Sequence, residues 1–169
     1  MNNIIAELRT NGTVKGLCSD WQGKLNDGAG IKRLSELFIR GIDFCISENF
    51  PTLEFLRDNF KGKCEPYGIF IDEEVAEKNC QNVVLNGECH AELTYEGYAV
   101  SQVFIRHESK VEIIASGHSF ITIDAFDNSF VKITTLSPSA SVIVNVYGDA
   151  EIKYIGQKPK MRVKNKPFY

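Results

Sequence analysis

The chain has 169 residues, of which 43% are hydrophobic and 24% are charged, and its formal net charge is -3. It is long enough to bury an interior and fits one domain, or one core with an appendage. No run of about 18 apolar residues occurs, which excludes a membrane-spanning helix. The first residues mix acidic and basic side chains where a secretory signal would be apolar. We therefore expect a cytoplasmic protein.

The charges are distributed unevenly along the chain. Residues 1–65 carry nine basic and nine acidic side chains, whereas residues 66–157 are net -8 and residues 158–169 are net +5. Together with the hydrophobic pattern, this distribution predicts three parts: a helical N-terminal region, a β-repeat region and a basic C-terminal tail.

Residues 1–65 have the apolar spacing of amphipathic helices. A first stripe has apolar residues four positions apart: Leu17, Trp21 and Leu25. A turn is expected before it, at Asn11-Gly12. The longest stripe predicts a helix over 31–48. Pro51 can open a further helix, which Gly62 would end.

A ten-residue pattern recurs eight times between Gln81 and Gly156. Each unit has an apolar anchor: Val83, Leu93, Val103, Val111, Ile121, Val131, Val142 and Ile152. A second apolar residue follows each anchor by two positions, and a small residue usually precedes it by two. Because side chains alternate along a strand, the three positions share one buried face. The spacing includes one step of eight residues, between Val103 and Val111.

Two α+β architectures fit this repeat. One places a two-walled β-solenoid with about twenty residues per coil after the N-terminal helices, and the alternative is an antiparallel β-meander. The hairpin dipeptides Asn-Gly and Asp-Gly are absent between Leu93 and Ile152, which favours the solenoid. The two architectures differ in one relationship, since Phe120 and Phe130 lie on opposite walls of a solenoid but are neighbours in a meander.

The solenoid interpretation gathers polar side chains on one of its two edges. This candidate edge for a metal or polar ligand contains Cys89, His90, His107, Glu108, Asp127, Asn128 and Asp149. Coils about 4.8 Å apart would bring such side chains within reach of one ion. The opposite edge has fewer side chains that could bind a ligand. Turns are also polar for conformational reasons, and no recognised ligand spacing occurs, so no cofactor is predicted.

Two further groups of residues predict contacts with partners. Four apolar side chains fall on outward positions and predict cover by the helices or a subunit interface: Phe104, Phe120, Phe130 and Ile143. In the tail every second residue is basic, so that an extended strand would carry on one side Lys158, Lys160, Arg162, Lys164 and Lys166. The alternative for the tail is a frayed end. The acidic repeat region would repel a nucleic-acid duplex, so we expect the tail to fold back on that acidic face or to dock on an acidic partner.

A resemblance rests on four segments: Cys18-Ser-Asp-Trp-Gln, Leu37-Phe-Ile-Arg-Gly-Ile-Asp-Phe-Cys45, Cys64-Glu-Pro-Tyr-Gly68 and Asn145-Val-Tyr-Gly-Asp-Ala150. In these segments the chain resembles a group of uncharacterised proteins of gut Bacteroidota and their phages or prophages. The resemblance implies a helical N-terminal part, a β region of short repeats and a setting in a mobile element. If a phage encodes the chain, the resemblance implies a virion-associated protein. It implies no activity and no catalytic residues.

The motifs of common enzyme sites do not occur in the sequence. There is no G-x-S-x-G, no P-loop and no G-x-G-x-x-G, and the repeat explains the serines as small inward residues. We therefore predict a non-enzymatic assembly or interaction protein that forms a homo-oligomer or binds a protein partner. The alternatives are a ligand- or metal-binding protein that uses the polar edge, and a nucleic-acid accessory protein that uses the tail.

Overall fold

The structure, a computed structural model, describes residues 2–26, 28–164 and 166–169. The chain divides into two compact units, with the boundary between Tyr67 and Gly68. The first unit is helical and the second is a β-solenoid, which confirms the α+β fold and excludes the meander. No helix among the described residues is long and apolar enough to cross a membrane.

The helical unit contains α1 (Asn2–Val14), α2 (Ser19–Lys24), α3 (Ile31–Arg40), α4 (Ile42–Ser47), α5 (Leu53–Asn59) and the short 3-10 helix η1 (Glu65–Tyr67). Two predicted boundaries were wrong, and a glycine in close contact with another side chain lies at each of them. At Gly12, a Cβ would lie 2.9 Å from Leu17 Cδ2, and α1 continues through the expected turn. At Gly41, a Cβ would lie 3.3 Å from the ring of Trp21, and the helix predicted over 31–48 is interrupted there.

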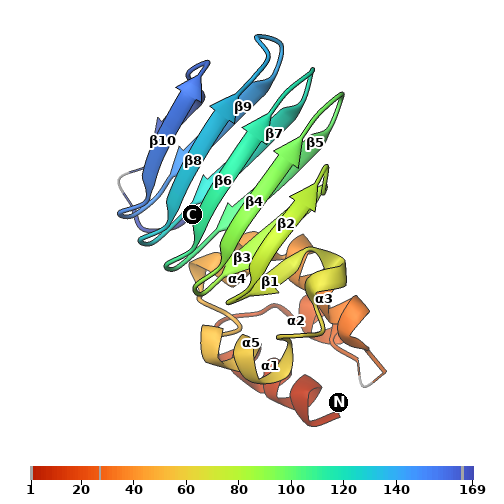
Figure 1. Ribbon diagram of the computed structural model, residues 1–169. Coiled ribbons are helices and arrows are strands. Elements are labelled where there is room, and N and C mark those ends of the chain that lie inside the picture. The colour runs from red at the N-terminus through yellow and green to blue at the C-terminus, as the bar shows by residue number, and fades with distance from the viewer. Residues whose placement is uncertain (1, 27, 165) are drawn as a thin grey trace. The chain divides into compact units, whose positions relative to one another are not determined.

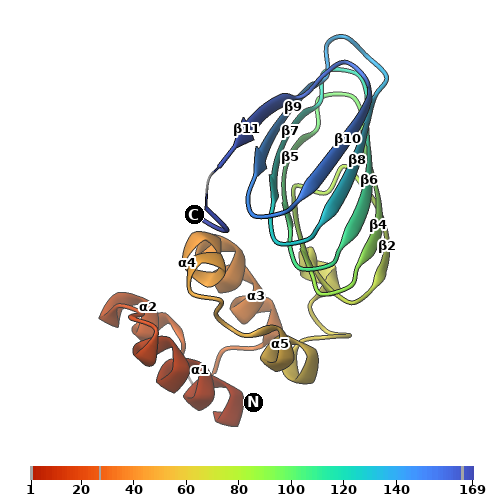
Figure 2. The same ribbon diagram turned by 90° about the vertical axis from the view of Figure 1, so that its left-hand side faces the viewer.

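The solenoid unit contains β1 (Ile69–Ile71), β2 (Glu74–Lys78), β3 (Asn82–Asn86), β4 (His90–Tyr95), β5 (Val100–Ile105), β6 (Lys110–Ala115), β7 (Phe120–Ala125), β8 (Phe130–Thr135), β9 (Ser141–Val146), β10 (Glu151–Gly156) and β11 (Lys160–Val163). The odd-numbered strands form a six-stranded sheet and the even-numbered strands a five-stranded sheet. Every strand pair is parallel, so successive strands alternate between the two walls (Figures 1 and 2).

The register of the coils corrects part of the predicted repeat. Ala91 pairs with Val111, which pairs with Val131, and Ser101 pairs with Ile121. The anchors assigned to the first three units therefore lie two residues too late, and the step of eight residues does not exist. The pattern search followed the largest side chains, whereas backbone pairing and turn length set the register.

The core of the solenoid consists of inward side chains stacked in columns from coil to coil. Leu93, Ile113 and Ile133 form one such column and are 1%, 0% and 0% exposed. Burial of an aliphatic side chain of this size contributes about 1.5–3 kcal/mol to stability. The small inward residues predicted next to the turns are confirmed, since Ser109, Ser119 and Ser129 are fully buried.

Candidate functional site

The polar edge predicted from the sequence lies where odd-numbered strands turn into even-numbered strands. One residue in each of four turns has a positive φ, namely Gly87 (79°), His107 (60°), Asp127 (59°) and Gly148 (62°). Non-glycine residues tolerate this conformation poorly, but here their side chains form compensating hydrogen bonds. The Gly87 N–H donates to His107 Nδ1 (3.0 Å), and the His107 N–H donates to Asp127 Oδ2 (2.8 Å). The two side chains thus link three successive coils by hydrogen bonds to the backbone.

A second column on this edge is formed by the residue that follows each positive-φ position. It contains Glu88, Glu108, Asn128 and Asp149, all of which are exposed. Asn128 Nδ2 donates to Glu108 Oε1 at 2.7 Å. Five of the seven predicted edge residues are therefore brought together in two adjacent columns.

The other two predicted edge residues, Cys89 and His90, lie elsewhere because the assumed register was two residues out. Cys89 is fully buried and its Sγ donates to the carbonyl oxygen of Asn86 at 3.3 Å. His90 is the first residue of β4 and lies on the outer face of its sheet, where its Nδ1 is 3.0 Å from Glu74 Oε1.

Burial raises the pKa of the Cys89 thiol, which disfavours the thiolate that binds metals. Within the described part of the chain, no group of three or more histidine, cysteine and acidic side chains is arranged to hold a metal ion. A metal or small-ligand site on the polar edge remains a prediction.

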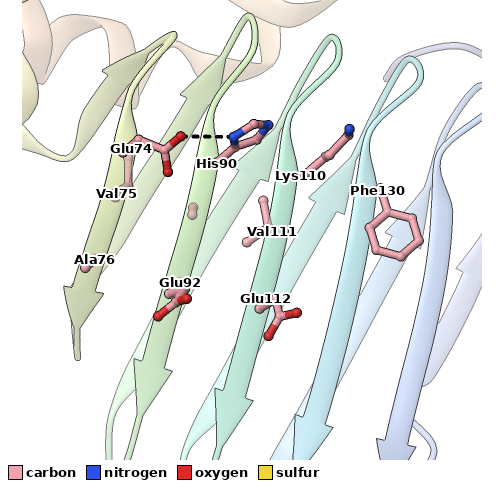
Figure 3. Close-up of a pocket in the computed structure, with 10 residues that line it drawn as sticks. Glu74, Val75, Ala76, His90, Glu92, Lys110, Val111, Glu112 and Phe130 are labelled. Carbon is pink, nitrogen blue, oxygen red and sulfur yellow. Dashed lines mark hydrogen bonds and ion pairs between the residues drawn. The ribbon is translucent and has the colours of Figure 1, made fainter.

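The outer face of the five-stranded sheet carries a shallow hollow of about 610 Å³. Figure 3 shows Glu74, His90 and Lys110 side by side on β2, β4 and β6, followed by Phe130 on β8. One row further along the strands, Lys132 Nζ lies 2.9 Å from Glu112 Oε1. Acidic and basic side chains thus neutralise one another across this face, as expected for a solvated sheet surface.

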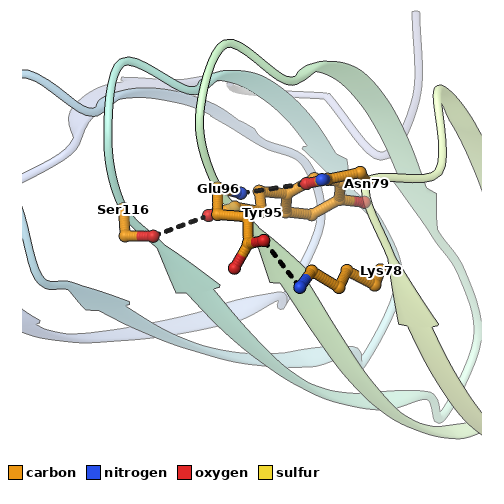
Figure 4. Close-up of polar contacts among 5 residues, drawn as sticks. All are labelled: Lys78, Asn79, Tyr95, Glu96 and Ser116. Atoms are coloured by element: carbon orange, nitrogen blue, oxygen red, sulfur yellow. Dashed lines mark hydrogen bonds and ion pairs between the residues drawn. The ribbon is translucent and has the colours of Figure 1, made fainter.

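The opposite edge, where even-numbered strands turn into odd-numbered strands, has more side-chain contacts than its sequence indicated. Lys78 Nζ lies 2.6 Å from Glu96 Oε1, and the Glu96 N–H donates to Asn79 Oδ1 at 2.9 Å (Figure 4). One position beyond the glycines of two adjacent turns, the rings of Tyr98 and His118 stack with centroids 5.0 Å apart. The sequence analysis missed this pair, although a common spacing of twenty residues could have revealed it.

The four outward apolar residues do not form one surface. Phe120 begins β7 and Phe130 begins β8, so they lie on opposite walls, as the solenoid predicted. Phe120 is 41% exposed, Phe104 is 1% exposed, and Phe130 and Ile143 are half-buried. An interface made of all four is therefore not available.

The basic tail is part of the solenoid and supplies its last strand. β11 pairs in parallel with β9, and beyond it the Lys164 N–H donates to the carbonyl oxygen of Val146 at 2.9 Å. Met161 packs against the core, so alternation turns Lys160 and Arg162 outward. The sequence predicted this one-sided arrangement of bases on an extended strand.

The terminal strands β10 and β11 form an open end of the solenoid. Among the described strands, each is the last in its sheet. Side chains that occupy inward columns are exposed here: Tyr154 is 44% and Val163 is 71% exposed, while Ile152 and Met161 are only partly buried. In the same columns Ile133 and Ala125 are fully buried. Sequence reasoning identified Tyr154 as an apolar repeat residue but did not identify its exposure.

No protein-family model matches the chain, no curated protein matches it, and no solved structure matches it.

Proposed function

We propose that this chain is a non-enzymatic assembly or interaction protein, whose β-solenoid binds other polypeptide chains through its open end. The observation that carries the proposal is the exposure of Tyr154 and Val163, which belong to columns that are buried in the preceding coils. Open strand edges with apolar side chains are the surfaces on which proteins add further strands.

The polar edge supports the same proposal by the role of its side chains. His107 Nδ1 and Asp127 Oδ2 each accept a hydrogen bond from the backbone of an adjacent coil. Such contacts stiffen a stack of coils and serve a rigid body better than a reaction centre. The resemblance to proteins of gut Bacteroidota and their phages adds a mobile element as the expected setting.

The test places a photo-crosslinking amino acid at Tyr154 or Val163 in the full-length chain, expressed in the cells that naturally make it. We expect discrete crosslinked species, identified by mass spectrometry as a second copy or as a specific partner. The control is the same amino acid at Glu92, an exposed position on the outer face of β4. The proposal fails if both kinds of position give the same products or none, and if native mass spectrometry shows a monomer at every concentration.

A further inference from the structure

We propose that the open end accepts an extended acidic segment of a partner protein, which adds to the solenoid as a strand beside β11. This inference rests on the proposed function and specifies the chemistry of the partner. The occupant is a polypeptide strand in which acidic and apolar residues alternate.

The backbone of β11 supplies the first part of the site. N–H and C=O groups of successive residues in a strand point to opposite edges, and the Lys164 N–H points to β9, where it donates to Val146. The backbone groups of Arg162 and Lys160 therefore also face β9. Those of Met161 and Val163 face the open edge, in the plane where a further strand would pair.

The side chains of β11 specify what that strand should carry. Along β11 and the residue that follows it, Lys160, Arg162 and Lys164 alternate with the apolar residues Met161 and Val163. No residue from Lys158 to Lys164 is acidic, so these basic side chains have no acidic neighbour within their own segment of the chain. A partner strand with carboxylates on its outer side would face the basic side chains, and apolar residues on its inner side would face Met161 and Val163.

A second copy of the chain fits this end less well. A two-fold contact between two open ends would bring Lys160 and Arg162 close to the same bases of the other copy. Stacking on the first coil of another copy would continue the inward column that runs from Glu77 through Leu93 to Tyr154. That arrangement would set the Glu77 carboxylate against the tyrosine ring in a closed core, and an inward charge of this kind discourages pairing between edges.

Nucleic acid would neutralise the basic side chains of the tail but would not match the rest of the site. Phosphates offer no regular partners to the open N–H and C=O groups of Met161 and Val163, and they would leave Tyr154 exposed. The charge of β11 and its open backbone thus point together to a polypeptide.

The experiment uses the full-length chain and a short synthetic peptide in which glutamate and valine alternate. We expect saturable binding by fluorescence anisotropy, together with slower hydrogen exchange of the Met161 and Val163 amides. Three probes serve as controls: an alternating lysine–valine peptide, a peptide with the same glutamates and valines in two blocks, and a single-stranded oligonucleotide of equal charge.

Two variants test the two parts of the site. The double change Lys160→Glu and Arg162→Glu should weaken peptide binding at least about tenfold. The double change Lys15→Glu and Lys32→Glu, at exposed positions of the helical unit, alters the net charge equally and should leave binding unchanged. Val163→Pro removes an N–H at the open edge without removing a bond to β9, and should also abolish protection of Met161.

Several results would overturn the inference. They are absence of peptide binding, equal binding by the charge-reversed variant, equal binding of the block peptide, and oligonucleotide binding that matches the acidic peptide. If the peptide fails but crosslinkers at Tyr154 still capture a specific partner, the acidic-strand inference falls and the proposed function stands. If both fail, the open end is not an interaction site.

Discussion

The carboxylate of Asp127 accepts a hydrogen bond of 2.8 Å from the backbone N–H of His107, which lies twenty residues earlier on the adjacent coil. Asp127 itself has a φ of 59°, a conformation that costs a residue with a Cβ about 1–2 kcal/mol. At this residue the hydrogen bond stabilises the folded chain and the backbone strain destabilises it. Substitutions can separate the two contributions to stability.

Asp127→Ala should lower the free energy of unfolding by about 1–2 kcal/mol, because it removes the hydrogen bond and keeps the strain. Asp127→Gly should cost clearly less, because glycine relieves the strain. Asp127→Asn, which keeps the acceptor, should behave like the native protein. Chemical denaturation measures the stabilities, and hydrogen exchange of the His107 amide reports the bond directly. Equal losses for the alanine and glycine variants would contradict this account.

The inward serines provide a matched comparison of buried hydroxyl groups. Within the described residues, the hydroxyls of Ser119 and Ser129 have no hydrogen-bond partner, whereas Ser109 Oγ donates to the carbonyl oxygen of Gly87 at 3.0 Å. Removal of an unsatisfied buried hydroxyl relieves a desolvation cost. Ser119→Ala and Ser129→Ala should therefore leave stability unchanged or raise it by up to about 1 kcal/mol.

Ser109→Ala is the control and should lower stability by about 1 kcal/mol, since Ser109 Oγ also accepts from the Cys89 N–H at 3.4 Å. Thermal and chemical unfolding of the three variants would measure the differences. If Ser129→Ala destabilised the chain as much as Ser109→Ala, Ser129 would need a partner that the structure does not contain.

Much of the solenoid could be predicted from the sequence, because an even period keeps the inward face from unit to unit. The burial of Ser119 follows from that periodicity alone. The opposite-wall placement of Phe120 and Phe130 also required the absence of Asn-Gly and Asp-Gly turns, which favoured the solenoid over the meander. The register at Ala91 and Ser101 could not be read in the same way. Both are small residues at positions where later coils carry Val111 and Ile121. A search that follows the largest side chains therefore places the anchor two residues too late in these units.

In the candidate sites, too, features set by the local sequence could be predicted, whereas features set by neighbouring coils could not. The column of His107 and Asp127 was predictable, because its members recur at a fixed spacing and suit turns. The misplacement of Cys89 and His90 followed from the register error. The exposure of Tyr154 was not predictable, because its residue type is that of a buried position. Its exposure follows instead from the place of β10 as the last strand of its sheet among the described strands.

The five cysteines should differ widely in reactivity. Cys18 is exposed, whereas Cys45, Cys64 and Cys89 are buried and Cys80 is half-buried. Burial raises the pKa of the Cys80 and Cys89 thiols, and Glu77 adds to the effect at Cys80. Because the thiolate is the reactive species, we expect rapid alkylation at Cys18 only, with Cys80 slower and Cys89 slowest.

A short pulse of a maleimide on the native protein, followed by peptide mass spectrometry, measures these rates. Cys18→Ser should remove the rapid phase and leave the other rates unchanged. Labelling of Cys89 as fast as Cys18 would show that the coil around it opens readily, and would argue against a rigid solenoid.

Tyr95 should make the stability of the solenoid decrease as the pH rises in the alkaline range. Its side chain is 1% exposed, and burial, with a smaller contribution from the charges of Cys80 and Glu77, raises the pKa of Tyr95 to about 12 from an ordinary value of 10.0. Ser101 Oγ lies 2.8 Å from the carbonyl oxygen of Cys80 and 3.0 Å from Tyr95 Oη. The serine has one proton and the carbonyl only accepts, so the neutral phenol donates to Oγ.

In the unfolded chain Tyr95 loses its proton near pH 10, whereas the folded chain holds it until about pH 12. Stability that is fully present below pH 10 is therefore lost as the pH rises to 12, by at most about 2–3 kcal/mol. Tyr95→Phe should flatten this decline, and Tyr98→Phe, at a side chain that is 81% exposed, is the matched control. Denaturation midpoints between pH 9 and 12 test the prediction. The same slope in the native protein and in Tyr95→Phe would mean that another group controls alkaline unfolding.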